Sequence, residues 1–233
     1  MWLEVVYRPT TLFSLRQSRA TSSGAKSLLT PSPYAVKMAL LNAIITYDSI
    51  QLAKENFNLI RDLEMRFSLP GKLVVNNCFL KIQKEPHSDK KKEHPEINFQ
   101  STVGFREYVY LAGDVKIAFM VEDNKIKNFL KQWFPLINYF GKRGCFFQFI
   151  KFKETNNLGS EYSVLLNKNF TNLMPGIIVE MDDFDKTANF DNVNTYSATK
   201  TKRRKRYYVL PMELNRANKN YTLYSGLQRK RLG

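Results

Sequence analysis

The pattern of apolar and polar positions predicts a chain in which strands and helices are mixed. Residues 2–7 are rich in valine and aromatic residues and predict a short first strand. Ser32 and Pro33 predict the start of a helix, because serine is a favoured N-cap and proline fits the first helical position. Residues 34–47 are apolar almost all round, which indicates that this helix is buried.

A second helix is expected after Asp48, which can cap it. Apolar residues then recur every three or four positions up to Pro70-Gly71, where the helix should end; they are Ile50, Ala53, Phe57, Ile60, Leu63 and Phe67. Residues 72–83 predict a strand, and residues 84–98 predict a charged surface loop.

The next segments predict a hairpin, a helix and a strand. Residues 105–111 and 115–121 form the two arms of the expected hairpin, which a turn near Gly113-Asp114 joins. A third helix should begin near Asp123 and end or kink at Pro135. The run from Cys145 to Lys153 is apolar on both faces, which is typical of a central strand.

This order of elements predicts an α+β protein. A ferredoxin-like, or RRM-like, βαββαβ core over residues 1–153 accommodates it. Residues 154–233 are interpreted as a polar, basic extension of the same domain, made of short strands and loops. With 43% hydrophobic and 13% aromatic residues among 233, the chain can bury a sizeable core, which excludes global disorder.

Charge is strongly positive and unevenly distributed. The chain carries 36 Lys and Arg against 21 Asp and Glu, a net charge of +15. Residues 200–233 hold eleven basic residues and one acidic residue, a net +10, and residues 1–40 add +4. Such an excess indicates a polyanionic partner: nucleic acid is expected, and an anionic membrane surface is the competing interpretation. Residues 180–191 are acidic instead and predict a solvated loop.

The sequence favours a cytoplasmic protein without a membrane partner. No basic n-region precedes the apolar residues 2–7, as a signal peptide would require. No apolar stretch reaches the roughly 20 residues that span a bilayer. Cys78 and Cys145 each lie in an apolar stretch, which suits a reducing compartment better than a disulfide framework.

A glycine turn is the first candidate site; it comprises Gly141, Lys142, Arg143 and Gly144. Glycines allow positive φ, so successive N–H groups can converge on one phosphate while the two cations supply charge. The alternative is a helix C-cap with two solvated side chains.

A basic run is the second candidate site. Lys200–Arg206 holds six cations in seven residues, among them Lys202, Arg203 and Arg204. Salt bridges within the run cannot neutralise so many cations, whereas a nucleic-acid backbone would, and the tyrosines that follow could stack on bases. The alternative is a disordered basic loop or a localisation signal.

Two further segments carry candidate residues. The long loop of residues 8–32 has a composition that suits sugar-phosphate contacts and equally suits a flexible surface loop. Its candidate cations are Arg16, Arg19 and Lys26. Alternation along strand 105–111 places three side chains on one face, either to stack on bases or to pack in the fold. These are Arg106, Tyr108 and Tyr110.

Catalysis has little support in the sequence. The two histidines, His87 and His94, lie in the charged loop expected to be solvated. The chain has no Cys/His spacing for zinc, no Walker-type phosphate loop and no nucleophile elbow. We therefore expect no metal and no cofactor, although an RNase can use Tyr, Lys or His without a metal.

One combination of segments resembles a known family. It consists of the strand 2–7, a helix rich in Ala and Leu opened by Pro33-Tyr34, and the stretch Phe140–Phe149 with its Gly-Lys-Arg-Gly turn. These segments resemble the RAMP superfamily of CRISPR-associated proteins and, within it, the Cas-five subunit of type I Cascade complexes. The resemblance covers roughly residues 1–153.

The resemblance implies a ferredoxin-like fold that caps the 5′ end of the guide RNA. It implies that the repeat-derived handle is held by the glycine turn and neighbouring basic loops, beside the large subunit and the first backbone RAMP subunit, with target DNA nearby. Only Gly141 to Gly144 match a motif residue by residue. One branch of the family cleaves precursor RNA, and its catalytic residues have no match here.

The leading hypothesis is a non-catalytic RNA-binding subunit of a CRISPR ribonucleoprotein for antiviral defence. Its expected RNA-binding residues are Arg16, Arg19, Lys26, Arg106, Gly141, Lys142, Arg143, Gly144, Lys202, Arg203 and Arg204. The second hypothesis is a metal-independent endoribonuclease that processes CRISPR repeat RNA. The third is a basic scaffold protein that coats RNA or DNA without guide specificity.

Overall fold

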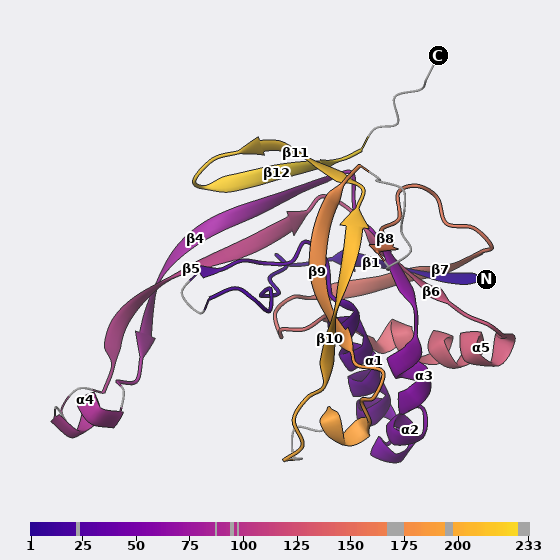
Figure 1. Ribbon diagram of the computed structural model, residues 1–233, viewed down its shortest axis with the longest axis horizontal. Helices are drawn as coiled ribbons and strands as arrows, with labels where there is room; N and C mark the ends of the chain where they lie inside the picture. The colour runs from indigo at the N-terminus through magenta and orange to yellow at the C-terminus, as the bar shows by residue number, and fades with distance from the viewer. Residues whose placement is uncertain are drawn as a thin grey trace.

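Three sheets and a group of helices make up the described part of the chain (Figure 1). The computed structural model describes residues 1–21, 24–86, 88–93, 96, 98–166, 175–193 and 198–227. These residues mix strands with fewer helices, as the α+β prediction requires. Within them, no helix is long and apolar enough to cross a membrane.

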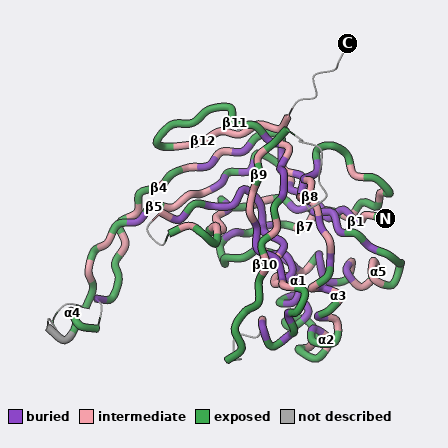
Figure 2. The backbone as a smooth tube through the Cα atoms, viewed as in Figure 1, coloured by how far each residue is buried: buried purple, intermediate pink, exposed green. Residues whose placement is uncertain are grey.

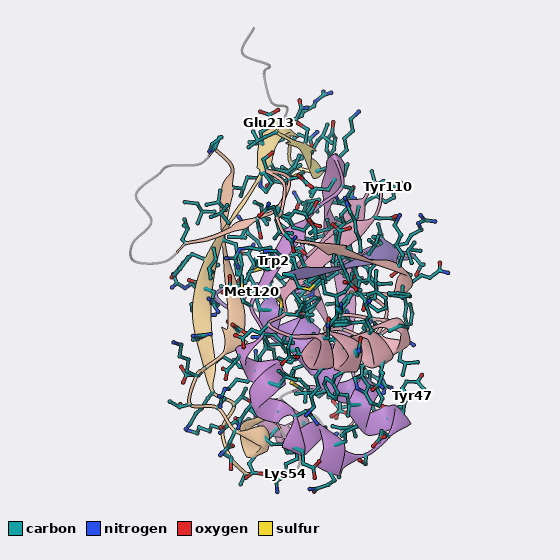
Figure 3. All side chains as sticks on the ribbon, turned by 90° about the vertical axis from the view of Figure 1, so that its right-hand side faces the viewer. Trp2, Tyr47, Lys54, Tyr110, Met120 and Glu213 are labelled. Atoms are coloured by element: carbon teal, nitrogen blue, oxygen red, sulfur yellow. The ribbon has the colours of Figure 1, made fainter. Side chains whose placement is uncertain are left out.

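The first sheet has the order β3-β6-β1-β7, and all its neighbouring strands are antiparallel. Its strands are β1 (Trp2–Pro9), β3 (Met65–Ser68), β6 (Val115–Met120) and β7 (Phe147–Thr155). β1 has a paired strand on each side, and Leu3 to Tyr7 are all buried, so both faces of this strand are covered. At the end of the sheet Trp2 lies opposite Met120, and Figure 3 shows the two side chains close together.

Helices follow the first and third strands of this sheet. They are α1 (Pro33–Tyr47), α2 (Ile50–Glu55), α3 (Phe57–Asp62) and α5 (Asn124–Trp133), the last continued by the 3-10 turn η1 (Phe134–Leu136). The predicted start of α1 is confirmed, because the Ser32 hydroxyl accepts a hydrogen bond from the N–H of Ala35 at 3.2 Å. The Asp123 carboxylate accepts from the N–H of Ile126 in the same way at the start of α5.

A long hairpin dominates the second sheet, whose order is β11-β12-β4-β5-β2. The strands of this sheet are β2 (Gly24–Ala25), β4 (Lys72–Lys84), β5 (Gln100–Leu111), β11 (Met212–Ala217) and β12 (Tyr221–Gly226). The short helix α4 (Ser88–Glu93) lies between β4 and β5. Figure 1 shows the hairpin β4–β5 extending away from the other sheets, with α4 at its tip. The buried positions lie near the body, and the outer half of the hairpin is largely exposed or half-buried (Figure 2).

The third sheet has the order β8-β10-β9 and packs against α1. Its strands are β8 (Val164–Leu166), β9 (Ile177–Phe184) and β10 (Arg203–Leu210), and the 3-10 turn η2 (Phe190–Asn192) follows β9. Phe184 is fully buried between the rings of Tyr34 and Phe57. Residues after 154 thus share a core with the first helices.

The predicted second helix is partly wrong. Ser49, not Asp48, caps α2 by accepting from the N–H of Leu52, and the helix breaks into α2 and α3. The chain then turns extended at Leu63 (φ −51°, ψ 121°) and forms strand β3. Met65 and Phe67 are buried and lie two positions apart, which is the period of a strand, although Phe67 also continues the helical spacing seen in the sequence.

Two strand assignments also need correction. Residues 105–111 and 115–120 are strands, but they do not form a hairpin with each other: β5 pairs with β4, while β6 pairs with β1 and β3. Ile117, Ala118 and Phe119 are consecutively and fully buried, so both faces of β6 are covered, as is typical of a central strand. β7, predicted as a central strand, lies at the edge of its sheet instead.

Candidate nucleic-acid interface

A groove of about 850 Å³ lies where the loop 8–32, α1, the glycine turn, β9 and β10 meet. Five of the predicted RNA-binding residues line it, although they come from four segments far apart in sequence: Arg16, Arg106, Gly141, Lys142 and Arg203. Lys205 adds a fifth cation, and the hydroxyls of Ser14, Ser18 and Ser32 add polar groups. Convergent cations and hydroxyls are what a sugar-phosphate backbone requires.

The glycine turn forms one wall of the groove. Gly141 and Gly144 have φ of +74° and +100°, the left-handed region that favours glycine. The turn closes a bridge between Tyr139 and Phe146, and α5 already ends at Trp133, so the helix C-cap interpretation is wrong. In the described part of the chain the N–H groups of residues 141–144 have no hydrogen-bond acceptor, which leaves them available to an anion.

The loop 8–32 is held by specific contacts on the protein surface. Arg16 forms a bridge with Ser27 inside the loop, and the N–H of Leu28 donates to the carbonyl of Leu15 at 2.8 Å. At its start, the Thr11 hydroxyl donates to the carbonyl of Gly144 at 2.7 Å. The loop is therefore attached to the glycine turn.

Residues 203–206 of the basic run belong to strand β10, so the disordered-loop interpretation is wrong for these four residues. Strand alternation divides its cations between two faces. Arg203 and Lys205 line the groove, and the Arg203 guanidinium lies 3.9 Å from the centroid of the Tyr34 ring. Arg204 and Arg206 point to the other side, where both contact Asp183.

Asp183 is the centre of a buried charge cluster. It lies 2.6 Å from the Lys37 ammonium of α1 and 3.4 and 3.2 Å from the guanidinium groups of Arg204 and Arg206. The side chains of Lys37 and Asp183 are each 1% exposed. Burial lowers the pKa of Lys37, and the adjacent carboxylate of Asp183 partly offsets this.

The prediction of a solvated acidic loop over residues 180–191 is wrong for residues 180–184, whereas residues 185–191 lie in turns after β9. Residues 180–184 belong to β9 and pair in antiparallel register with β10, so that Asp182 lies opposite Lys205 and Asp183 opposite Arg204. The repulsion within the basic run is therefore relieved partly by carboxylates of the same chain. This counter-charge was not expected from the sequence.

Asp182 contacts both the basic strand and the loop. Its carboxylate accepts from Lys205 at 2.5 Å and from the Ser18 hydroxyl at 2.5 Å. Burial raises the pKa of Asp182, but the hydrogen bonds from Lys205 and Ser18 and the nearby Arg203 outweigh it, so the pKa lies below the ordinary value. The carboxylate is therefore charged at neutral pH, and the contacts that need its charge are lost only in acid, as the pH falls through that lowered pKa.

The remaining predicted residues lie around the groove. Arg143, Gly144 and Lys202 are exposed but do not line it, and Arg204 faces the buried cluster. Lys26 lines a second cavity of about 240 Å³ that shares Ala25 and Arg106 with the groove. Arg19 lies beside Glu180 at 2.7 Å.

Several residues of the two cavities were not predicted as binding residues; they are Tyr34, Glu180 and Asp182 in the groove and Lys219 in the second cavity. Lys205 was predicted only as a member of the basic run. The opposite charges of residues 180–183 and 203–206 were a usable signal, since acidic and basic side chains on paired strands attract. Tyr34 and Lys219 carried no such signal. Tyr110, predicted on the face of Arg106, is 54% exposed.

Metal-ligating side chains do not cluster within the described residues, where no group of three His, Cys, Asp or Glu side chains could hold an ion. His87 and His94 lie outside the described residues. The expectation that the protein lacks a metal and a cofactor stays a prediction.

The chain is similar to a CRISPR-associated protein along nearly its whole length. No family model matches it. It is 26% identical over 227 residues to "CRISPR-associated protein Cas5" of Archaeoglobus fulgidus, which covers 94% of this chain and 96% of that protein. The chain is therefore a homologue of that protein, in agreement with the resemblance found in its motifs.

Solved structures with similar backbones are also CRISPR proteins. A CRISPR protein from Archaeoglobus fulgidus has a TM-score of 0.46 and 12% identity, over 97% of this chain and 92% of that one. A chain of a CRISPR RNA-guided surveillance complex has a TM-score of 0.47 and 12% identity, over 89% and 88%. A chain of the type III-B Cmr-beta complex bound to cognate target RNA has a TM-score of 0.47 and 11% identity, over 65% and 59%. With scores below 0.5, these likenesses add nothing to the functional argument.

Proposed function

We propose that the chain, a homologue of a CRISPR-associated Cas5 protein, is a non-catalytic RNA-binding subunit of a CRISPR effector complex. Its groove would hold the 5′ repeat-derived handle of the guide RNA. The observation that carries the proposal is the convergence of Arg16, Arg106, Lys142, Arg203 and Lys205 on one groove of about 850 Å³. A single-stranded RNA backbone is a ligand with enough charge and reach to contact all five.

The connectivity of the first sheet supports the same proposal. A strand order of β3-β6-β1-β7, with helices after the first and third strands, is the arrangement of a ferredoxin-like βαββαβ core. The hairpin β4–β5 is then an insertion between the second and third strands of that core, and the basic segments after residue 154 extend it.

The hairpin supports a role inside a larger assembly. Its inner face is buried near the body and continues outward as an exposed apolar strip of Phe79, Val103 and Phe105, which are 60%, 54% and 56% exposed. The rings of Phe79 and Phe105 pack edge to face at 5.1 Å. Exposed apolar patches of this kind mark protein–protein contacts, so we assign the strip to a neighbouring subunit of the complex.

Replacing both rings tests this assignment. Phe79→Ser combined with Phe105→Ser should leave Tm almost unchanged, because the rings are exposed, but should sharply reduce the amount of neighbouring subunits that copurify with the tagged chain. Lys84→Ser is the control, because this exposed residue lies on the opposite face of β4, and it should leave copurification intact. Wild-type amounts of the other subunits with the double variant would remove the hairpin from the assembly interface.

The glycine turn gives a second prediction. Gly144→Ala should cost about 1 kcal/mol of stability, because alanine is strained at a φ of +100° although its Cβ would meet nothing within 4 Å. That Cβ would occupy the open space in front of the turn and weaken RNA binding beyond the stability loss. Lys142→Ala should weaken binding without a change in Tm, because its side chain is exposed. Normal RNA affinity in both folded variants would show that the turn is not a phosphate site.

The RNA that accompanies the chain in cells tests the proposed function itself. We expect tagged protein, expressed with a CRISPR array and its companion subunits, to copurify with RNA that begins in repeat sequence. The purified chain should not cleave repeat RNA in EDTA. Copurified RNA without repeat sequence would contradict guide binding, and specific cleavage in EDTA would show an endoribonuclease instead.

A further inference from the structure

The proposed groove contains two carboxylates that a phosphate site does not need. The side chains of Glu180 and Asp182 are 18% and 11% exposed, whereas the cations they contact are more exposed: Arg19 75%, Arg203 45% and Lys205 34%. The carboxylates therefore lie beneath the cations. A polyanion entering the groove would meet the cations first, with negative charge directly behind them.

These carboxylates also connect the two basic segments of the groove. Asp182 accepts from Ser18 in the loop 8–32 and from Lys205 in β10, each at 2.5 Å. Glu180 lies 2.7 Å from Arg19 of the same loop and accepts from the Tyr207 hydroxyl at 2.9 Å. Loop and strand are thus positioned relative to each other through β9.

We propose that Glu180 and Asp182 determine the selectivity of the groove. They lower its affinity for polyanions in general, and they hold the cations in positions that match the path of one RNA backbone. This inference rests on the proposed function. Each carboxylate attracts the same cations that a phosphate would use, so every polyanion loses part of the electrostatic attraction. A guide RNA regains that loss through several simultaneous, well-placed contacts, which an unrelated polyanion cannot make.

The two roles predict different effects on two ligands. Removing one negative charge from the groove should raise the affinity for any polyanion through Coulomb attraction alone. Weakening the contacts between the loop and β9 should at the same time disturb the contacts that only the guide RNA makes. Affinity for an unrelated strand should therefore rise more than affinity for the guide, and the ratio between them should fall.

The test compares isosteric variants that differ only in where charge is lost. Glu180→Gln and Asp182→Asn keep the side-chain shape and an oxygen that accepts hydrogen bonds. Glu154→Gln is the matched control, since Glu154 contacts Lys127 and Lys131 outside the groove and its loss changes the net charge equally. The probes are a mixed-sequence 20-nucleotide single-stranded DNA and the guide RNA recovered with the wild-type protein, at one fixed salt concentration.

We expect Glu180→Gln and Asp182→Asn each to bind the DNA roughly threefold more tightly than the wild type, with a smaller gain or a loss for the guide RNA. Glu154→Gln should match the wild type on both probes. DNA affinities of the two groove variants equal to that of Glu154→Gln would overturn the inference. Equal wild-type affinity for the guide RNA and the DNA would instead contradict the proposed function, and the DNA comparison would still decide the role of the carboxylates.

Discussion

Asp183→Asn should destabilise the protein by about 3 to 5 kcal/mol, the range observed when one partner of a buried ion pair is removed. The substitution leaves Lys37 buried at 1% exposure without its carboxylate and leaves Arg204 and Arg206 facing each other. In a chain of this length the loss corresponds to a fall in Tm of roughly 10 °C. Thermal unfolding followed by circular dichroism measures it.

Two further variants distinguish a buried charge cluster from an ordinary ion pair. Asp62→Asn removes the carboxylate that lies 2.6 Å from Arg61 at the surface, and should change Tm little. Adding Lys37→Met to Asp183→Asn should recover part of the lost stability, because the unpaired buried ammonium is then removed. Equal effects of Asp183→Asn and Asp62→Asn would contradict the central role of Asp183.

Removing three arginines from the groove should have the largest effect on RNA binding. Arg16→Ala, Arg106→Ala and Arg203→Ala together should lower guide-RNA affinity roughly a hundredfold, at about 1 kcal/mol for each charge-assisted hydrogen bond to phosphate. The slope of log affinity against log salt should become less steep by about 2, since each single-stranded phosphate contact contributes about 0.7. Titrations at several salt concentrations measure both effects.

The control for this experiment removes the same charge elsewhere. Alanine at Lys54, Lys125 and Lys153 changes three exposed cations that do not line the groove. We expect this triple variant to keep the wild-type salt slope, because those lysines make no phosphate contact. Equal slopes for the two triple variants would mean that RNA binding depends on the net charge of the protein alone and that the RNA does not occupy the groove.

Local signals predicted much of the fold. The N-cap at Ser32 and the helix start near Asp123 were predicted correctly, because helix starts depend on neighbours in sequence. Strand β3 was missed because Leu63 and Phe67 continue a helical spacing while Met65 and Phe67 also fit a strand. The pairing of β5 and β6 was wrong because two strands on either side of a short turn usually form a hairpin, and here the chain crosses into another sheet.

The residue types of the candidate site were predicted from the sequence, but their positions in the fold were predicted only in part. Glycines, arginines and lysines could be identified one segment at a time, and five of them line one groove. Arg203 and Arg204 could not be told apart without the register of β10, which sends one to the groove and the other to Asp183. The carboxylates of β9 were misread because their partners lie more than twenty residues away.

Ultraviolet crosslinking of the chain to its copurified RNA, followed by mass spectrometry of the crosslinked peptides, tests the RNA-binding groove most directly. We expect crosslinks in peptides that contain Tyr34, residues 139–143 or residues 203–207, because these border the groove. Crosslinks confined to α2, α3 and α5, which lie outside the groove, would contradict it.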